Sequence, residues 1–507
     1  MLLQALQNFF TLEALFSCII GVFGGIVVGA LPGLSASMAV ALLIPITFRM
    51  GTAAGLVLLV SVYTAAIYGG SITACLIHTP GTPASAATAI DGFPLTKKGE
   101  GLKAIGISTI ASMIGGTISA LALLFIAPTL AKVSLLFSSL EYFFLALFGL
   151  TIIGSLAGDS MVKGLMSGMF GLLIGCIGLD IMNGTPRFTF GSIALESGIQ
   201  LVPAMIGLFS ISQVMISVED IVKGKNKITD DPSKLLKGKI LPSKSEIKKI
   251  IPTIGLSSII GILVGILPGA GSDIGSWVSY NYAKKHSKTP HEFGNGSIEG
   301  LAASESANNA VTGGALIPLL TLGIPGSGVT AIMLGGLTIK GLVPGHQLFT
   351  QQGDITYCLI FGFLAANILM GIIGLLVAKQ VVKVSIVPMT ILCPIIVGLS
   401  TIGAYAINNS MFDVFIMTAF GFLGYFVRKL GFATAPIVLG LILGPMAEQN
   451  WRQALVLSRG NMMTYFLTRP ISILLAVMVI FGLFSPIFLK MFNKKTLGDA
   501  NAKSAED

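Results

Sequence analysis

The sequence GALPGLSAS at residues 29–37 returns as GILPGAGSD at residues 265–273, 236 positions further along the chain. In both copies an apolar run is interrupted by Leu-Pro-Gly and then resumes. Proline removes a backbone donor and glycine permits unusual dihedral angles, so a helix ends or unwinds at such a point. The sequence therefore predicts a broken helix at matching places in two halves of the chain.

Two further anchors follow in the same order. The stretch 69–82, from Gly-Gly to Thr-Pro-Gly-Thr, aligns with 313–327, and Pro203 aligns with Pro436. Self-similarity at a nearly fixed offset is the signature of an internal repeat. We therefore predict a first transmembrane repeat at 1–221, a basic linker at 222–249, a second transmembrane repeat at 250–450, an additional C-terminal helix at 451–490 and a polar tail at 491–507.

The composition is that of a membrane protein. Hydrophobic residues make up 53% of the 507 residues and charged residues only 10%, whereas about 25% of a soluble domain is charged. Because a transmembrane helix needs about 20 mostly apolar residues, we expect an all-α polytopic fold with roughly 10–12 transmembrane segments. The 31 Lys and Arg residues exceed the 22 acidic ones, but they lie between apolar runs, which favours topology signals over nucleic-acid binding.

The distribution of positive charge predicts the orientation in the bilayer. Nine lysines lie between residues 223 and 249, whereas the first 48 residues contain no Lys or Arg. Since Lys and Arg collect on the cytoplasmic side, the linker is expected in the cytoplasm and the N-terminus outside. The apolar run 15–30 lacks the basic start of a cleaved signal peptide and is expected to stay in the membrane. This arrangement predicts two halves of opposite orientation.

The breaks are the predicted substrate site. Paired interruptions in two halves point to the binding site of a secondary transporter, and free N–H groups at helix starts attract anions. An alternative for each hydroxyl is a bond to its own helix backbone. The predicted anion-binding residues are Gly33, Ser35, Thr79, Gly81, Thr82, Gly269, Gly271, Ser272, Gly326 and Ser327.

A polar intrusion in the second half is the predicted coupling site. Glu305, Asn308 and Asn309 share one or two turns of a predicted helix inside apolar sequence. An ionisable residue at membrane depth is a functional candidate by default. We predict that this group couples Na⁺ or H⁺ to transport, with no other metal and no cofactor, unless Glu305 faces water at the interface. At an offset of 244 the first half has Ser61, Thr64 and Ala65, so only the second half is expected to hold the ion.

Three other polar residues allow two interpretations each. Asp273 either coordinates the coupling ion or lies exposed at a helix start, where a carboxylate favours the helix dipole. His78 either relays protons or is a hydrogen-bonded structural residue. Arg187 either attracts a carboxylate at the mouth of the site or anchors the chain at the interface beside aromatic residues.

Two other classes of protein were weighed. An intramembrane protease is suggested by the Gly-Ser-Asp at 271–273 and by Ser327, but a second aspartate or a nearby base is also required. The nearest histidine in sequence to Ser327 is His346. A passive carboxylate channel would need no coupling residue, so flux that is independent of a gradient would favour it.

The same motifs identify a family resemblance. The stretches 29–48, 68–94 (YGGSITACLIHTPGTPASAATAIDGFP), 184–191 (GTPRFTFG) and 265–345 resemble the large membrane subunit of the tripartite tricarboxylate transporters. The resemblance extends over nearly the whole chain and is weakest in the central loop and at the C-terminus. His78 and Asp273 stand where the family more often has other residues.

The resemblance implies a function and a set of partners. It implies uptake of small di- and tricarboxylates across a bacterial inner membrane, driven by a cation gradient. It also implies a periplasmic substrate-binding protein and a small membrane subunit as partners. The family does not fix which carboxylate is carried, and the sequence leaves the choice between Na⁺ and H⁺ open.

Overall fold

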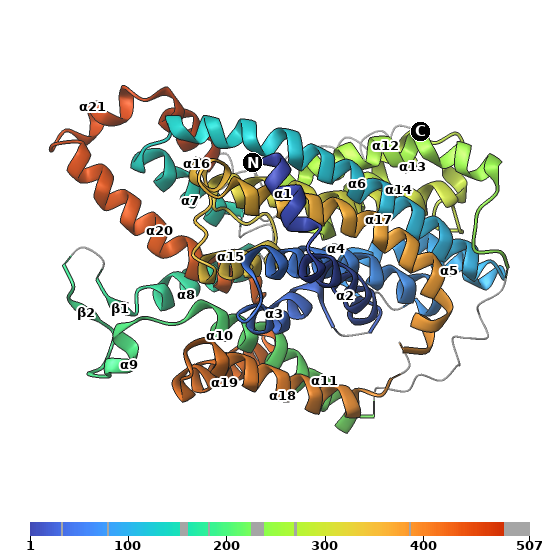
Figure 1. Ribbon diagram of the computed structural model, residues 1–507, viewed down its shortest axis with the longest axis horizontal. Coiled ribbons are helices and arrows are strands. Elements are labelled where there is room, and N and C mark those ends of the chain that lie inside the picture. The colour runs from blue at the N-terminus through green and yellow to red at the C-terminus, as the bar shows by residue number, and fades with distance from the viewer. Residues whose placement is uncertain are drawn as a thin grey trace, which may run out of the picture. The chain divides into compact units, whose positions relative to one another are not determined.

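The computed structural model describes residues 1–31, 34–78, 81–152, 161–180, 183–224, 238–267, 271–384 and 387–480. The chain forms two compact units, one of Met1–Leu135 with Ile199–Thr434 and the other of Leu136–Gly198 with Ala435–Asp507. Helices dominate both (Figure 1), and the strands among the described residues are two of two residues each. The predicted all-α fold is confirmed.

The first unit contains most of the helices. Its main elements are α1 (Leu2–Phe9), α2 (Leu12–Gly29), α3 (Ala36–Thr47), α4 (Thr52–Ile77), α5 (Ala86–Lys97), α6 (Gly101–Val133), α10 (Leu201–Met205), α11 (Ser212–Val222), α12 (Lys244–Ile266), α13 (Gly271–His286), α14 (Ile298–Leu322), α15 (Gly328–Ile339), α16 (His346–Thr350), α17 (Gly353–Val384), α18 (Met389–Asn408) and α19 (Met411–Lys429). A π-helical turn, Ile206–Ile211, joins α10 to α11.

Eight helices in the described part of the chain are long and apolar enough to cross a membrane. They are Leu12–Gly29, Thr52–Ile77, Gly101–Leu136, Leu201–Val222, Lys244–Ile266, Gly353–Val381, Met389–Asn408 and Met411–Lys429. Five shorter apolar helices accompany them. The predicted polytopic class is confirmed, and the number of crossings stays a prediction.

The centre of the first unit is made by α4 and α14. Every residue of α4 from 54 to 76 and every residue of α14 from 300 to 321 is buried. The surrounding helices expose large apolar side chains instead, among them Phe16 of α2, Phe125 of α6 and Leu263 of α12. Lipid is the expected neighbour of such a surface, because outside a membrane it would be an aggregation hazard. The two central helices are therefore shielded by lipid-facing ones.

Glycines set the contact between α2 and α4. A Cβ on Gly25 would lie 2.8 Å from the carbonyl oxygen of Val62, and a Cβ on Gly29 would overlap the carbonyl oxygen of Ala66. From the other side, a Cβ on Gly69 would lie 2.5 Å from a carbonyl oxygen of α2. Small residues let membrane helices approach until their backbones touch. This close approach fixes α2 along one face of α4.

The contact between α12 and α14 is built in the same way. A Cβ on Gly261 would lie 2.5 Å from the carbonyl oxygen of Ala307, and one on Gly265 would lie 2.6 Å from that of Val311. Relative to the α2–α4 contact, each residue is displaced by 236 positions on the first helix and by 245 on the second. The two pairs of helices thus share one pattern of glycine contacts.

This packing corrects the register between the halves. The predicted offset of 244 matched Glu305, Asn308 and Asn309 with Ser61, Thr64 and Ala65. The contacts give 245, which matches them with Val60, Tyr63 and Thr64 instead. An offset of 244 pairs both glycines of 69–70 with those of 313–314, whereas 245 pairs only Gly69 with Gly314. The packing selects 245, which also pairs Pro80-Gly81 with Pro325-Gly326.

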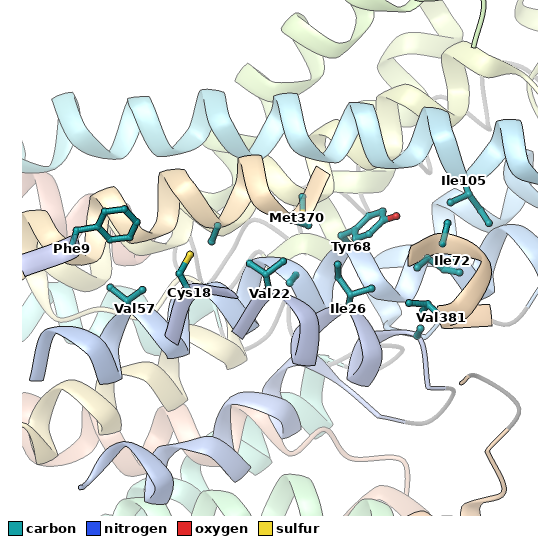
Figure 2. Packing of buried hydrophobic residues seen from close by; sticks show 14 of the residues in the cluster. Phe9, Cys18, Val22, Ile26, Val57, Tyr68, Ile72, Ile105, Met370 and Val381 are labelled. Atoms are coloured by element: carbon teal, nitrogen blue, oxygen red, sulfur yellow. The ribbon is translucent and has the colours of Figure 1, made fainter. Parts of the chain in front are cut away.

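A hydrophobic cluster holds the outer helices on the centre. It joins α1, α2, α4 and α17, and Figure 2 shows Phe9, Val22, Val57, Tyr68 and Met370 within it. α6 packs against both α14 and α17 (Figure 1). The long helices of the first unit are thereby tied together around α4 and α14.

The second unit is smaller. It contains α7 (Ser139–Ile152), α8 (Met161–Gly175), β1 (Gly178–Leu179), β2 (Pro186–Arg187), α9 (Ile193–Glu196), α20 (Ala435–Leu457) and α21 (Met462–Leu467). β1 pairs antiparallel with β2, Gly178 opposite Arg187. Both α7 and α8 pack on α20. A Cβ on Gly440 would overlap the carbonyl oxygen of Gly168, so glycine also sets the α8–α20 contact.

Two predicted boundaries fall inside helices. α12 begins at Lys244, so the last residues of the predicted linker 222–249 are helical. Ser243 and Glu246 form a capping box there, and this Ser-x-x-Glu signal starts the helix. α20 runs to Leu457 through the predicted boundary at 450. Residues 225–237 of the linker and the tail 491–507 lie outside the described residues, and the division into repeats stays a prediction.

Candidate functional site

Glu305 lies in the middle of α14 and is fully buried. Its carboxylate accepts hydrogen bonds from the hydroxyls of Thr88 on α5, Ser108 on α6 (3.1 Å) and Ser112 on α6 (2.8 Å). Ser108 and Ser112 are four residues apart, so they lie on one face of α6. Ser71 of α4 extends the cluster, with its hydroxyl 2.7 Å from that of Ser108. Three helices, α4, α5 and α6, thus surround the carboxylate of α14 with hydroxyl groups.

No basic side chain in the described part of the chain balances this carboxylate. Every salt bridge among the described residues involves other acidic groups. Burying an unpaired charge is costly, so such a group binds a proton or a cation. The surrounding oxygens are of the type that holds Na⁺ in transporters. No group of three or more His, Cys, Asp or Glu suited to a metal occurs in the described part of the chain.

Asn309 faces a different set of helices. Its amide nitrogen lies 3.3 Å from the hydroxyl oxygen of Thr64 on α4 and 3.3 Å from the sulfur of Met370 on α17. Thr64 in turn donates to Asn367 Oδ1 at 2.7 Å. Glu305 is bonded to α5 and α6, whereas Asn309 is bonded to α4 and α17. The predicted coupling residues are neighbours on α14 with separate hydrogen-bond partners.

Asn308 is fully buried, and its side chain has no hydrogen-bond partner among the described residues. Neither the amide oxygen nor the amide nitrogen is satisfied. The amide oxygen of Asn309 is also without a partner there. Buried polar groups are nearly always paired in folded proteins, so these amides mark a place where a ligand or an ion is expected.

The hydroxyls at the breaks begin helices. Ser35 caps α3, since its hydroxyl accepts from the N–H of Met38 at 3.2 Å. Ser327 caps α15 in a reciprocal pair with Thr330, whose hydroxyl accepts from Ser327 N–H at 2.8 Å. Thr82 is buried, with its hydroxyl 3.0 Å from that of Ser85. A helix start is therefore found after each of these breaks.

The two described break glycines, Gly81 and Gly326, are required by packing. A Cβ on Gly81 would overlap the carbonyl oxygen of Gly29, and one on Gly326 would lie 2.7 Å from that of Gly265. The N–H of Gly81 is donated to the carbonyl oxygen of Gly70 at 3.1 Å. In this conformation that N–H group is therefore already used inside the protein.

The remaining predicted residues are placed as follows. Gly271 starts α13 with a φ of +63°, which glycine adopts without strain. Ser272 is buried, and its carbonyl oxygen accepts from the hydroxyl of Ser276. Gly33, Thr79 and Gly269 and the side chain of Asp273 lie outside the described residues. Substrate binding by these residues stays a prediction.

His78 and Arg187 have local partners. His78 ends α4 in a left-handed conformation with a φ of 54°, and its ring centroid lies 4.9 Å from that of Phe93. Arg187 lies in a four-residue ion network of the second unit, 2.7 Å from Glu448 and 3.5 Å from Asp180. Arg452 completes that network, and the hydrogen bond to Glu448 raises the pKa of Arg187.

Sequence reasoning missed Asp91 on α5. Its buried carboxylate accepts from the N–H groups of Gly294, Gly296 and Ser297 at 2.8–2.9 Å and from the hydroxyl of Tyr280 at 2.9 Å. Burial raises the pKa of Asp91 and these hydrogen bonds oppose the shift. Asp91 thus ties α5 to the loop that begins α14.

The three hydroxyl partners of Glu305 were also missed. Thr88, Ser108 and Ser112 lie about 200 positions earlier in the chain, and a hydroxyl in a helix usually bonds its own backbone. The spacing of Ser108 and Ser112 by four residues is a usable signal for one polar face. Nothing in the sequence indicates which distant group that face meets.

The hydroxyl of Ser327 has no base beside it in the described part of the chain. Its oxygen lies 3.1 Å from that of Thr330 and 3.4 Å from the Tyr63 hydroxyl. A serine nucleophile needs a neighbouring His or Lys to remove its proton. This geometry does not favour a serine protease.

Fold and site together define a multi-pass helical membrane protein with a buried carboxylate and interrupted helices, two features found in secondary transporters. Residues 15–439 match the model of the tripartite tricarboxylate transporter TctA family, and the chain belongs to that family. The family is one of transporters, and its members are permease subunits of tripartite systems.

Two relatives from Agrobacterium vitis are similar to this chain. One, described as an uncharacterized 52.8 kDa protein in the TAR-I ttuC' 3'region, is 38% identical over 455 residues, covering 90% of this chain and 89% of the relative. The other, an uncharacterized protein in the TAR-II ttuC' 3'region, is 42% identical over 212 residues, covering 42% of this chain and 87% of the relative. No solved structure matches the chain significantly.

Proposed function

We propose that this protein imports small di- or tricarboxylates across the bacterial inner membrane and couples uptake to Na⁺ or H⁺ through Glu305. The observation that carries the proposal is the buried, hydroxyl-bonded carboxylate of Glu305, which no basic side chain in the described residues neutralises. A carboxylate in such a site binds a cation when charged and a proton when neutral.

The negative charge of the substrate supports coupling of its uptake to a cation. An anionic substrate is repelled by the inside-negative membrane potential, at a cost of about 2.3 kcal/mol per charge per 100 mV. Accumulation therefore requires cations to enter with the substrate. A passive channel would let the anion leave and would have no use for the site around Glu305.

The predicted anion site at the breaks completes the proposal. Ser35 and Ser327 each begin a helix of 12 residues, so the positive ends of α3 and α15 lie at the breaks. The substrate's carboxylates would be held by N–H and hydroxyl groups there, without a fixed basic residue. Family membership supports a periplasmic substrate-binding protein and a small membrane subunit as partners. We propose no cofactor.

We propose also that the two halves are inverted repeats. The shared pattern of glycine contacts at offsets of 236 and 245 supports the repeat, and the Lys-rich linker supports a cytoplasmic position between the halves. Thr11→Cys and Ser245→Cys, labelled with a membrane-impermeant thiol reagent in intact cells and in broken cells, test the inversion. The two positions should react from opposite sides, and reaction from the same side would contradict it.

Glu305→Gln tests the coupling. The variant keeps the size of the side chain and removes its charge. The three subunits reconstituted in proteoliposomes should lose accumulation driven by an imposed Na⁺ or H⁺ gradient, while exchange of labelled carboxylate across the membrane persists. Glu299→Gln, on the first turn of the same helix and bonded to Ser287, is the matched control and should accumulate normally. Normal, cation-dependent accumulation by Glu305→Gln would show that Glu305 is structural.

A further inference from the structure

Two matched residues of α4 and α14 touch each other. Thr64 and Asn309 are related by the offset of 245, and the amide nitrogen of Asn309 lies 3.3 Å from the hydroxyl oxygen of Thr64. When two elements are related by a two-fold axis, equivalent residues meet only where the axis passes between them. The axis implied by the matched contacts therefore runs between α4 and α14 at Thr64 and Asn309.

Tyr63 and Asn308 precede these two residues by one position, and the two-fold axis gives them equivalent environments on opposite sides. Here the first break is the one at residues 79–82 and the second break is the one at residues 324–327. The hydroxyl of Tyr63, on α4, lies 3.4 Å from the hydroxyl of Ser327 at the second break. The offset of 245 relates Tyr63 to Asn308 and Ser327 to Thr82. The hydroxyl pairs agree with this relation, because Ser327 with Thr330 (3.1 Å) matches Thr82 with Ser85 (3.0 Å). If the two-fold relation holds at this position as well, the side chain of Asn308 is expected beside Thr82 at the first break.

The two sides differ in how this position is filled. The side chain of Tyr63 is long enough to contact Ser327 at the second break. Asparagine is several atoms shorter, and the amide of Asn308 is fully buried with no partner among the described residues. A free NH₂ group is a hydrogen-bond donor that suits a carboxylate. The first break is thus the one with an unused donor beside it.

We propose that Asn308 is a substrate-binding residue, whose amide N–H donates to a carboxylate group of the substrate at the first break beside Thr82. At the matched place beside Ser327 the Tyr63 hydroxyl already makes a contact, so this amide donor has no counterpart there. This assignment rests on the proposed carboxylate transport, and it moves Asn308 from the predicted cation site to the anion site. One chain then carries one asymmetric substrate site, although its scaffold is repeated.

The experiment separates substrate binding from cation binding. The complete three-subunit system is reconstituted in proteoliposomes, and counterflow is measured with labelled citrate, succinate, fumarate and tartrate to find one that the wild type exchanges. For Asn308→Ala we expect the half-saturating concentration of that carboxylate to rise about tenfold or more, because a hydrogen bond to a charged group is lost. The half-saturating concentration of Na⁺ or H⁺ should stay within twofold.

Tyr63→Phe is the matched control at the equivalent position. It removes the hydroxyl that contacts Ser327 and should leave the carboxylate affinity within twofold. Asn308→Ser, which keeps a small hydroxyl donor, should fall between the wild type and Asn308→Ala, and it replaces Asn308→Ala if that variant fails to fold. Thermal unfolding of the purified proteins identifies any folding defect.

Two results would overturn the proposal. An unchanged carboxylate affinity in folded Asn308 variants excludes substrate contact, and a shift confined to the cation dependence returns Asn308 to the cation site. If the wild type exchanges none of the four carboxylates, carboxylate transport itself is contradicted, which is distinct from a failure at Asn308 alone.

Discussion

The helix pair α2–α4 and the helix pair α12–α14 have the same glycine contacts and different polar residues. Where α14 has Glu305, Asn308 and Asn309, the matched positions of α4 hold Val60, Tyr63 and Thr64. The glycines cannot change without displacing a backbone, whereas the residues between them are free to diverge. Packing therefore fixes the scaffold of both helix pairs, and the polar residues proposed to bind ligands occupy the positions where the pairs differ.

Alanine at the packing glycines should have the largest effect. Gly29→Ala places a methyl group onto the carbonyl oxygen of Ala66, and Gly265→Ala places one near that of Val311. Overpacking costs about 1–3 kcal/mol, and the deeper overlap at Gly29 should lower the unfolding temperature of the purified protein more. Gly24→Ala and Gly255→Ala, which meet nothing within 4 Å, should not lower it. Equal effects at all four glycines would show that the close contacts of Gly29 and Gly265 do not set the stability of the helix pairs.

Removing a hydroxyl from the Glu305 cluster should alter the response to the coupling ion. Ser112→Ala deletes a donor 2.8 Å from the carboxylate, and a hydrogen bond to a charged group contributes about 1.5–3 kcal/mol. If Na⁺ is the coupling ion, losing this hydroxyl oxygen should raise its half-saturating concentration about tenfold or more. If H⁺ is the coupling ion, its half-saturating concentration should fall instead, because the lost bond had stabilised the charged carboxylate. Ser119→Ala on the same helix is the control, since that hydroxyl bonds the carbonyl oxygen of Gly116. A similar shift in both variants would indicate a general packing effect.

Asp91 tests how the first half positions α14. Asp91→Asn leaves one oxygen to accept from the N–H groups of the loop 294–297 but removes the charge that strengthens these bonds, and it should destabilise the protein by about 1–3 kcal/mol. Tyr280→Phe removes a single donor from the same carboxylate and should cost about 1 kcal/mol. Thermal unfolding of the two variants measures the difference. If Tyr280→Phe proved the more damaging, the N–H groups would not be the main partners of Asp91.

The capping residues after the breaks should give the smallest effect. Thr330→Ala removes the hydroxyl that accepts from the N–H of Ser327 and contacts the Ser327 hydroxyl, which costs about 0.5–2 kcal/mol, while the bond from the N–H of residue 330 to Ser327 Oγ remains. Ser85→Ala at the matched position removes only the contact between two hydroxyls, because the start of α5 has no side-chain cap. We expect a smaller decrease in unfolding temperature for Ser85→Ala. A larger decrease would show that the first break depends more on its hydroxyls than the second.

The sequence by itself determined the class of protein and the places of the breaks. Long apolar runs with few charges leave no alternative to membrane helices, and Pro-Gly pairs interrupt helices wherever they occur. It also identified Glu305 and Asn308 as polar residues within apolar sequence. These features are local, so they are readable without knowing which helices meet.

Only the tertiary structure decided what those residues contact. The hydroxyls of Thr88 and Ser112 reach Glu305 because α5 and α6 pack on α14, and no periodicity in the sequence specifies that pairing. The register of 245 was likewise set by how closely glycine backbones approach, because the adjacent glycines taken alone favour an offset of 244. The amide of Asn308 has no partner among the described residues for the same reason: whether a buried amide finds a partner depends on the distance between helices, which a sequence pattern does not contain.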